Sequence, residues 1–255
     1  MRTEIAILAV TAALTTAVPA KAECRYEEPR EVSAAAAGIS AVRIEGSSGS
    51  LEVIGGRGSA IKASGRACVS DRAYLDATRL TLRRDGSMLV IEAHTAEARG
   101  GWFGNSYANL PFVVEVPSNL PIDIEDGSGP LGVRGVASAS IRDGSGPIDV
   151  SNVAGDLRVR DGSGSMVLEK IGGTIRIQDG SGSIDVKGVG RDVIVEEDGS
   201  GSIDIRDVTG SVMIEDDGSG SIDVRNVGGD FTVLEDGSGG ISFKDVRGRV
   251  AIPRD

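Results

Sequence analysis

Carboxylate side chains at a regular spacing are the residues of this chain best placed to do chemistry. The tetrapeptide Asp-Gly-Ser-Gly begins at seven positions: Asp126, Asp143, Asp161, Asp179, Asp198, Asp217 and Asp236. In the later copies, more acidic residues stand directly before it. Hard cations such as calcium prefer clustered carboxylate and carbonyl oxygens. The candidate calcium ligands are therefore Glu197, Asp198, Asp216, Asp217, Glu235 and Asp236.

A structural role for the same aspartates competes with cation binding. Asp-Gly is typical of turns, where the Asp side chain accepts hydrogen bonds from the peptide N–H groups that follow it. If the repeats stack at ~4.8 Å, neighbouring carboxylates repel each other by about 0.9 kcal/mol in water. Either these hydrogen bonds or a bound cation would offset that cost. The hydrogen bonds need no ligand, so we expect no cofactor, with calcium as the alternative.

Catalysis finds little support among the remaining residues. The only histidine, His94, has no nucleophile pattern or metal-ligand spacing around it. Elongated β-helices can cleave polysaccharides with a pair of carboxylates, but such a pair would be a local exception, whereas these carboxylates recur in every unit. We therefore expect a protein that is not an enzyme, and we keep a polysaccharide-active enzyme as a secondary hypothesis.

The repeated units predict the elements that would position these carboxylates. Successive tetrapeptides are 17, 18, 18, 19, 19 and 19 residues apart. Apolar residues recur five and seven positions after each Asp, as in Ile184 and Val186, and again after fourteen and sixteen positions, as in Val193 and Val195. A spacing of two places both side chains on one face of a strand. Each unit thus predicts two short strands, separated by a Gly-containing corner near the eleventh and twelfth positions.

The fold follows from the size of the unit. Two short strands cannot bury their own apolar face, so stacking of successive units is favoured. We predict an all-β, single-domain parallel β-solenoid (β-helix) with coils of about 19 residues. Antiparallel hairpins at each Asp-Gly would leave the recurring residue types unexplained. Degenerate N-terminal coils are expected at 46–53, where Gly46-Ser47-Ser48-Gly49 precedes Leu51 and Val53, and at 85–91, where Asp85-Gly86-Ser87 precedes Leu89 and Ile91.

The start of the chain predicts export. An apolar run at 5–18 leads to Ala20-Lys21-Ala22, so residues 1–22 are expected to be a signal peptide. The predicted mature chain comprises a β-rich part at 23–120, with an aromatic loop, and the seven DGSG coils at 121–255. Its two cysteines, Cys24 and Cys68, would form a disulfide in an oxidising compartment. The expected location is the periplasm, the cell surface or the extracellular medium.

Candidate contact surfaces lie where the repeats depart from uniformity. The net charge of −11 disfavours nucleic acid as a partner, and no other apolar stretch is long enough to cross a membrane. Ile194 and Met213 belong to an apolar stripe on an otherwise charged strand face, whereas Trp102, Phe103 and Tyr107 lie in the aromatic loop. That loop is either a partner anchor or a plug over the solenoid. A monomer or weak self-association is expected.

Three motifs carry a family resemblance: GSSGSLEV near the start, VVEVPSNLPIDIEDGSG in the middle, and G-S-I-D-V-x-x-V-x-G units to the end. With them the chain resembles the bacterial exported β-strand-repeat family labelled "putative adhesin". The resemblance implies a β-solenoid of the cell envelope and no site residues. Together with the stripe and the loop, it leads us to expect a non-enzymatic, adhesin-like scaffold or binding protein with an unidentified macromolecular partner. The alternative is a calcium-dependent structural or binding module.

Overall fold

The computed structural model describes residues 24–97 and 106–253. The predicted signal peptide, Trp102 and Phe103 lie outside these residues. The described residues form 23 strands and one short 3-10 turn, η1 (Arg72–Tyr74). None of their helices is long and apolar enough to cross a membrane.

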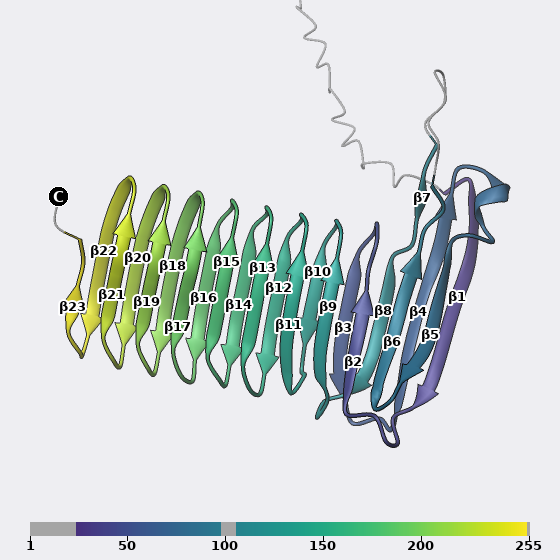
Figure 1. Cartoon of the computed structure of the whole chain (residues 1–255), viewed down its shortest axis with the longest axis horizontal. Helices are drawn as coiled ribbons and strands as arrows, with labels where there is room; N and C mark the ends of the chain where they lie inside the picture. Colours follow the sequence, from purple (N-terminus) through teal and green to yellow (C-terminus); the bar gives the residue numbers. More distant parts are fainter. Residues whose placement is uncertain (1–23, 98–105, 254–255) are drawn as a thin grey trace, which may run out of the picture.

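The strands form two sheets that run along an elongated body (Figure 1). In spatial order, sheet A contains β1 (Tyr26–Ala35), β4 (Ala60–Val69), β8 (Phe112–Pro117), β3 (Leu51–Gly56), β10 (Leu131–Arg134), β12 (Ile148–Val153), β14 (Met166–Ile171), β16 (Ile184–Val189), β18 (Gly201–Val208), β20 (Gly220–Val227) and β22 (Gly239–Val246), with β7 (Ala108–Asn109) attached to β4. Sheet B contains β5 (Arg79–Asp85), β6 (Met88–His94), β2 (Ala41–Glu45), β9 (Pro121–Asp126), β11 (Ser138–Asp143), β13 (Leu157–Asp161), β15 (Ile175–Asp179), β17 (Val193–Asp198), β19 (Val212–Asp217), β21 (Phe231–Asp236) and β23 (Val250–Ala251).

Parallel pairing in register confirms the predicted solenoid. Ile184 pairs with Ile203, which in turn pairs with Ile222, so one repeat position forms a continuous row along sheet A. Val193 and Val212 begin the equivalent row in sheet B. All five side chains are buried between the sheets. Each row takes one apolar residue from each coil. Stacking the coils therefore removes from water an apolar face that a single unit would leave exposed.

The corner between the two strands of a unit follows the tenth position, as predicted, because strands such as β14 and β16 end there. Glycine stands at the eleventh or twelfth position of every unit but the first, for example Gly172 and Gly173. The backbone already enters the left-handed region before these glycines, at the ninth position of every unit. The residues there are Gly135, Asn152, Lys170, Gly188, Asp207, Asn226 and Asp245, with φ between 54° and 74°. Gly, Asn and Asp tolerate this conformation best, so all but Lys170 follow the steric preference.

The first coil does not lie at the end of the stack. Strands β2 and β3 sit between the later pair β6 and β8 on one side and β9 and β10 on the other. The predicted degenerate corner at 46–49 is confirmed, because Ser48 bridges to Ser128 and Leu51 pairs with Leu131. The chain thus forms one inner coil, adds the N-terminal strands outside it, and then returns to begin the regular stack.

The second predicted degenerate unit, at 85–91, has a different structure. Asp85, Gly86 and Ser87 connect β5 and β6 as an antiparallel hairpin, with Gly86 at φ 60°. Leu89 and Ile91 are buried, but they extend the rows of sheet B and not those of sheet A. The prediction of a solenoid corner is wrong here because Asp-Gly is also a favoured hairpin turn, and only the pairing partner distinguishes the two.

Candidate functional site

The aspartates of the repeated tetrapeptide point into the solenoid. They form a row along one corner, and the exposed fraction of the residue falls from 9% at Asp126 to 1% at Asp198 and Asp217. Successive members pair in register, as Asp179 with Asp198 and Asp198 with Asp217. We call Asp126, Asp143, Asp161, Asp179, Asp198 and Asp217 the aspartate row. Among residues 24–97 and 106–253, the buried polar residues are these six aspartates and Thr78.

A β-bulge keeps the row pointing inward when the coil grows from 18 to 19 residues. Between β15 and β17 the register shifts after Ile177. Val195 is buried, Glu196 and Glu197 both face outward, and Asp198 is buried again. Two consecutive outward residues on one strand are the mark of a bulge. The extra residue of the first longer coil is thus Glu196, and the same position holds Glu215 and Leu234 in the next two coils.

Burial changes the protonation of the aspartate row. Loss of hydration, together with the charge of a neighbouring aspartate of the row, raises the pKa of Asp126, Asp143 and Asp179 to about 6. Asp198, between two carboxylates, has its pKa raised to about 7 by the same two causes in the same order. Peptide N–H groups of the tetrapeptide oppose these shifts. The row therefore holds protons that free aspartates would have released.

The predicted turn hydrogen bonds satisfy only part of this row. The amide of Ser163 donates to Oδ1 of Asp161 at 3.3 Å. Both carboxylate oxygens of Asp143, Asp179, Asp198 and Asp217 are buried without a hydrogen-bond partner. Turn hydrogen bonds therefore do not offset the cost of stacking these carboxylates, and protonation lowers that cost only below about pH 6 to 7.

The structure divides the predicted calcium ligands between two sides of the sheet. Asp198 and Asp217 belong to the buried row, and the half-buried Asp236 continues it. Exposed on the outside are the other three candidates, Glu197, Asp216 and Glu235. Within the described residues, no three acidic, His or Cys side chains are arranged to hold a metal ion. Calcium binding at this corner stays a prediction.

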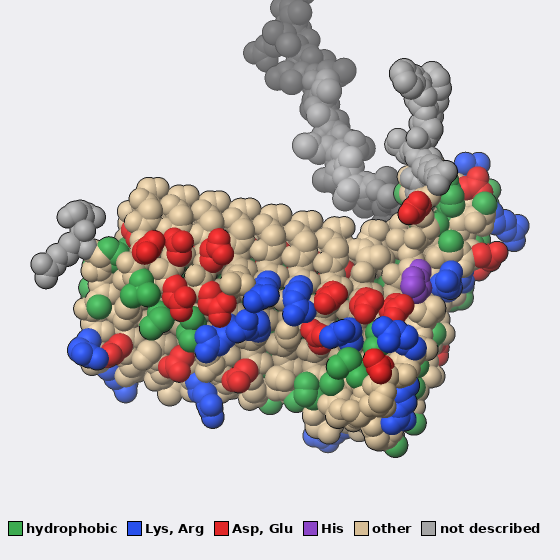
Figure 2. Space-filling model, viewed as in Figure 1, with side chains coloured by type: hydrophobic (Ala, Val, Ile, Leu, Met, Phe, Trp, Pro, Cys, Tyr) green, Lys and Arg blue, Asp and Glu red, His purple; other side chains and the backbone are tan. Residues whose placement is uncertain are grey.

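The apolar stripe lies in register on the outward face of sheet B. Ile194 pairs with Met213, Met213 with Thr232, and Thr232 with Ala251. Met213 is 37% exposed, and Leu234, one strand further along the same face, is 56% exposed. The face seen in Figure 2 accordingly shows apolar side chains beside acidic ones over the coils nearest the C terminus.

A group of arginines, which the sequence analysis did not single out, continues the outward rows of sheet B. Arg158 pairs with Arg176, and Arg142 pairs with Arg160. Oε1 of Glu196 lies 3.5 Å from Arg158 and 3.7 Å from Arg176. Basic side chains consequently gather over the middle coils in Figure 2. The detectable signal was Arg at the fifteenth position of two successive units, Arg158 and Arg176. Arg142 and Arg160 stand at the sixteenth and seventeenth positions of their units, and only the strand register makes them neighbours.

An open hollow of about 470 Å³ lies beside these arginines, over β9, β11, β13 and β15. Two carboxylates border it, as a catalytic pair would, but each is already engaged. Asp123 forms an ion pair with Arg43 at 2.8 Å. Asp156 accepts a hydrogen bond of 2.8 Å from the amide of Thr174. These carboxylates therefore have structural partners in the described chain.

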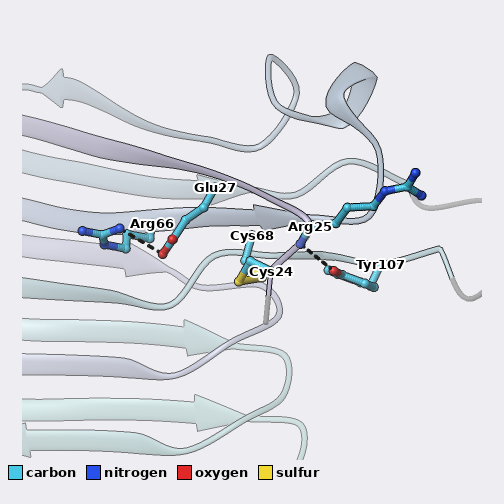
Figure 3. The surroundings of a disulfide bond; sticks show 6 residues. All are labelled: Cys24, Arg25, Glu27, Arg66, Cys68 and Tyr107. Atoms are coloured by element: carbon cyan, nitrogen blue, oxygen red, sulfur yellow. Dashed lines mark hydrogen bonds and ion pairs between the residues drawn. A yellow bond between two sulfur atoms is a disulfide. The ribbon is translucent and has the colours of Figure 1, made fainter. Parts of the chain in front are cut away.

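The N-terminal part is fastened by the predicted disulfide. Cys24 and Cys68 are bonded, with 5.3 Å between their Cα atoms (Figure 3). Nearby, the hydroxyl of Tyr107 accepts a hydrogen bond of 3.1 Å from the amide of Arg25. The amide of Tyr107 donates to Oγ of Ser70 at 3.0 Å. Of the three aromatic residues predicted to contact a partner, Tyr107 is thus tied to the body, while Trp102 and Phe103 lie outside the described residues.

Loss of the disulfide is expected to lower the stability of the N-terminal part. The bond joins residues 44 positions apart, and a loop of that length contributes roughly 4 kcal/mol by restricting the unfolded chain. We expect the Cys24→Ser/Cys68→Ser variant to melt at a lower temperature, by circular dichroism, and a reductant to shift only the wild-type protein toward the variant. Identical melting of both proteins without reductant would contradict a stabilising role.

By its fold, this chain is a two-sheet parallel β-solenoid protein. No family model matches it, and no curated protein matches it. Among solved structures it is similar to a "putative adhesin" from Bacteroides fragilis (12% identity, TM-score 0.38, covering 90% of this chain and 98% of that one). It is also similar to a "putative lipid binding protein" from Parabacteroides distasonis (15% identity, TM-score 0.38, covering 89% of this chain and 97% of that one). A third similar structure is a "putative cell adhesion protein" from Clostridium sporogenes (11% identity, TM-score 0.27, covering 88% of this chain and 99% of that one).

Proposed function

We propose that this chain is a non-enzymatic, adhesin-like binding protein of the cell envelope or extracellular space. Its rigid solenoid presents the outward face of sheet B to a macromolecular partner. The apolar stripe is the observation that carries the proposal. Ile194 and Met213 are neighbours in register on this face. The two residues that precede them in the same row, Arg158 and Arg176, are charged. Adjacent exposed apolar side chains on a charged surface are typical of contact sites.

The surroundings of the stripe indicate the chemistry of the partner. Exposed acidic residues, Glu215, Asp216 and Glu235, lie beside Met213 and Leu234. An apolar centre with a charged rim is the usual anatomy of a protein contact. A protein with an apolar patch edged by Lys or Arg would complement it, and the rim would act mainly on the association rate.

The location in the envelope is supported by the disulfide and by the start of the sequence. Bonded cysteines persist in oxidising compartments and are rare in the cytosol. The predicted signal peptide points to the same compartment. Export and a stiff solenoid together suit a protein that displays a surface at a distance from its attachment.

Charge on the stripe is expected to abolish the contact. We expect Ile194→Glu/Met213→Glu to reduce retention of the purified protein on native cell envelopes by at least about tenfold, because buried carboxylates would lack partners. The matched control is Val167→Glu, since Val167 is equally exposed, at 37%, but lies on sheet A. Equal retention of the stripe variant, the control and the wild type would refute a contact at this face.

A further inference from the structure

We propose that the hollow over β9, β11, β13 and β15 binds a saccharide that bears carboxylate or sulfate groups. We call this place the arginine hollow and define it by Arg158, Arg176, Ser138, Ser140 and Thr174, all of which line it. It goes beyond the protein contact proposed above, because it uses other residues at the middle of the solenoid.

The shape of the arginine hollow follows from the lengths of the coils and side chains. The unit that starts at Asp126 is the shortest, at 17 residues, and it is shortened at the corner that leads into β11. On the outward face of β11, Ser138 and Ser140 have short side chains, whereas Arg158 stands in the next strand beside Ser140. A floor of serines between longer side chains leaves the open space. Its volume of about 470 Å³ lies within the roughly 300–1,000 Å³ common for ligand sites.

Asp123 and Asp156 also line the arginine hollow, but Asp123 is paired with Arg43 and Arg142, and Asp156 accepts a hydrogen bond from the amide of Thr174. Arg158 and Arg176 are therefore the charged groups available to an anion.

Arg158 and Arg176 share one acidic neighbour, Glu196, at 3.5 and 3.7 Å, which is longer than a close ion pair. Arg160 has no ion-pair partner among residues 24–97 and 106–253. Glu196 neutralises one of the two positive charges, and the side chains of Arg158 and Arg176 remain 43% and 44% exposed. Guanidinium groups bind carboxylate or sulfate oxygens in pairs.

The remaining lining selects a saccharide over other anions. Ser138, Ser140 and Thr174 supply hydroxyl groups that can donate to and accept from sugar hydroxyls. Nucleic acid has a dense row of phosphates, which a chain with a net charge of −11 would repel. An acidic saccharide differs from nucleic acid in its many free hydroxyl groups, which the serine and threonine side chains can engage. A lipid tail would need exposed apolar walls, whereas Ile122, Ala139 and Leu157, which border the hollow, are buried.

Binding of defined oligosaccharides tests the assignment. Calorimetry with a hexamer of galacturonate and with a sulfated hexasaccharide should show binding by the wild-type protein, weakened by added salt. A neutral maltohexaose should give no heat. The variant Arg158→Gln/Arg176→Gln should lose at least about tenfold in affinity, the amount expected from two charge-assisted contacts. Glu196→Gln should bind more tightly, because it removes the competing carboxylate.

A matched control separates this site from general electrostatics. Lys187→Gln/Arg225→Gln removes the same charge from the outward face of sheet A and should bind the acidic hexamers as the wild type does. The proposal is overturned if neither acidic hexamer binds, or if both double variants bind equally. It is also overturned if inorganic sulfate or phosphatidylglycerol vesicles bind as tightly as the hexamers. Retention on envelopes, tested with the stripe variant, stays a separate measurement of the proposed function.

Discussion

Raising the pH from 5 to 8 is expected to lower the melting temperature of this protein. Asp126, Asp143 and Asp179 have folded pKa values of about 6, and Asp198 has one of about 7, against 3.8 for an unperturbed Asp. Between these limits the folded state binds more protons than the unfolded state, so stability falls as the pH rises. This contribution is fully present below the unfolded value of 3.8 and is lost progressively as the pH rises through the folded values of about 6 to 7.

The size of this effect is large because several coils contribute. Each unit of pKa difference corresponds to about 1.4 kcal/mol, so a shift of roughly two units is worth on the order of 2–3 kcal/mol for a single aspartate. Neighbouring members titrate together, and their contributions do not simply add. We expect several kcal/mol across the aspartate row, measured in circular dichroism melts as a Tm that decreases from pH 5 to about 7 and levels off above it.

Replacing one member of the row tests the cause. Asp198→Asn keeps the shape of the most central side chain and removes its charge. The Tm of this variant should be higher than that of the wild type at pH 8 and nearly equal to it at pH 5. Its Tm should also depend less on pH. Asp149→Asn, on the outward face of β12, is the control and should preserve the wild-type profile. If Asp198→Asn melts lower than the wild type at pH 8, charged carboxylates in the row must be stabilised by something other than protonation, such as a bound cation.

Adding one methyl group at the last glycine of a tetrapeptide is expected to be among the most damaging changes. Gly201 has φ 150°, and a Cβ atom built on it would lie 1.4 Å from the carbonyl oxygen of Gly182 in the preceding coil. Backbone cannot yield as a flexible side chain can, so Gly201→Ala must separate the two coils locally. We expect a loss of more than about 4 kcal/mol, which is exceptional for one substitution.

Each coil contacts mainly its neighbours, so this damage should spread toward the C terminus. Limited proteolysis of Gly201→Ala should cut after β17 before the N-terminal coils are attacked. The matched control is Gly240→Ala, since a Cβ atom there meets nothing within 4 Å. The control should melt with the wild type. Equal melting of the two variants would show that close stacking at this corner does not limit stability.

Much of the fold is predictable because strand pairing repeats the same local arrangement. The alternation of apolar and polar residues assigns the strands and their buried faces, as for Ile184 and Val186. The constant residue type at each repeat position favours parallel stacking. The turn at 85–87 escaped this reasoning, because Asp-Gly suits both a solenoid corner and a hairpin, and the choice depends on which strand is available to pair.

The surfaces were less predictable than the fold. The stripe of Ile194 and Met213 was found because a single repeat position carries it. The arginines at 142, 158, 160 and 176 become one group only when two rows of one sheet are placed side by side. The hollow beside them forms where one corner is a residue shorter. The spacing of the tetrapeptides shows that a residue is missing, but it does not show the hollow that results.

The repeated tetrapeptide shows where local and tertiary effects divide. Its period, its turn-forming composition and its place between two apolar strands are local properties, and they establish a stacked β-solenoid. Whether its Asp faces water or the interior depends on one bulge per longer coil, which reverses the direction of every side chain after it. The pKa of Asp198, the separation of Glu197 from it and the close approach of Gly201 to Gly182 all follow from stacking, because each depends on atoms from another coil.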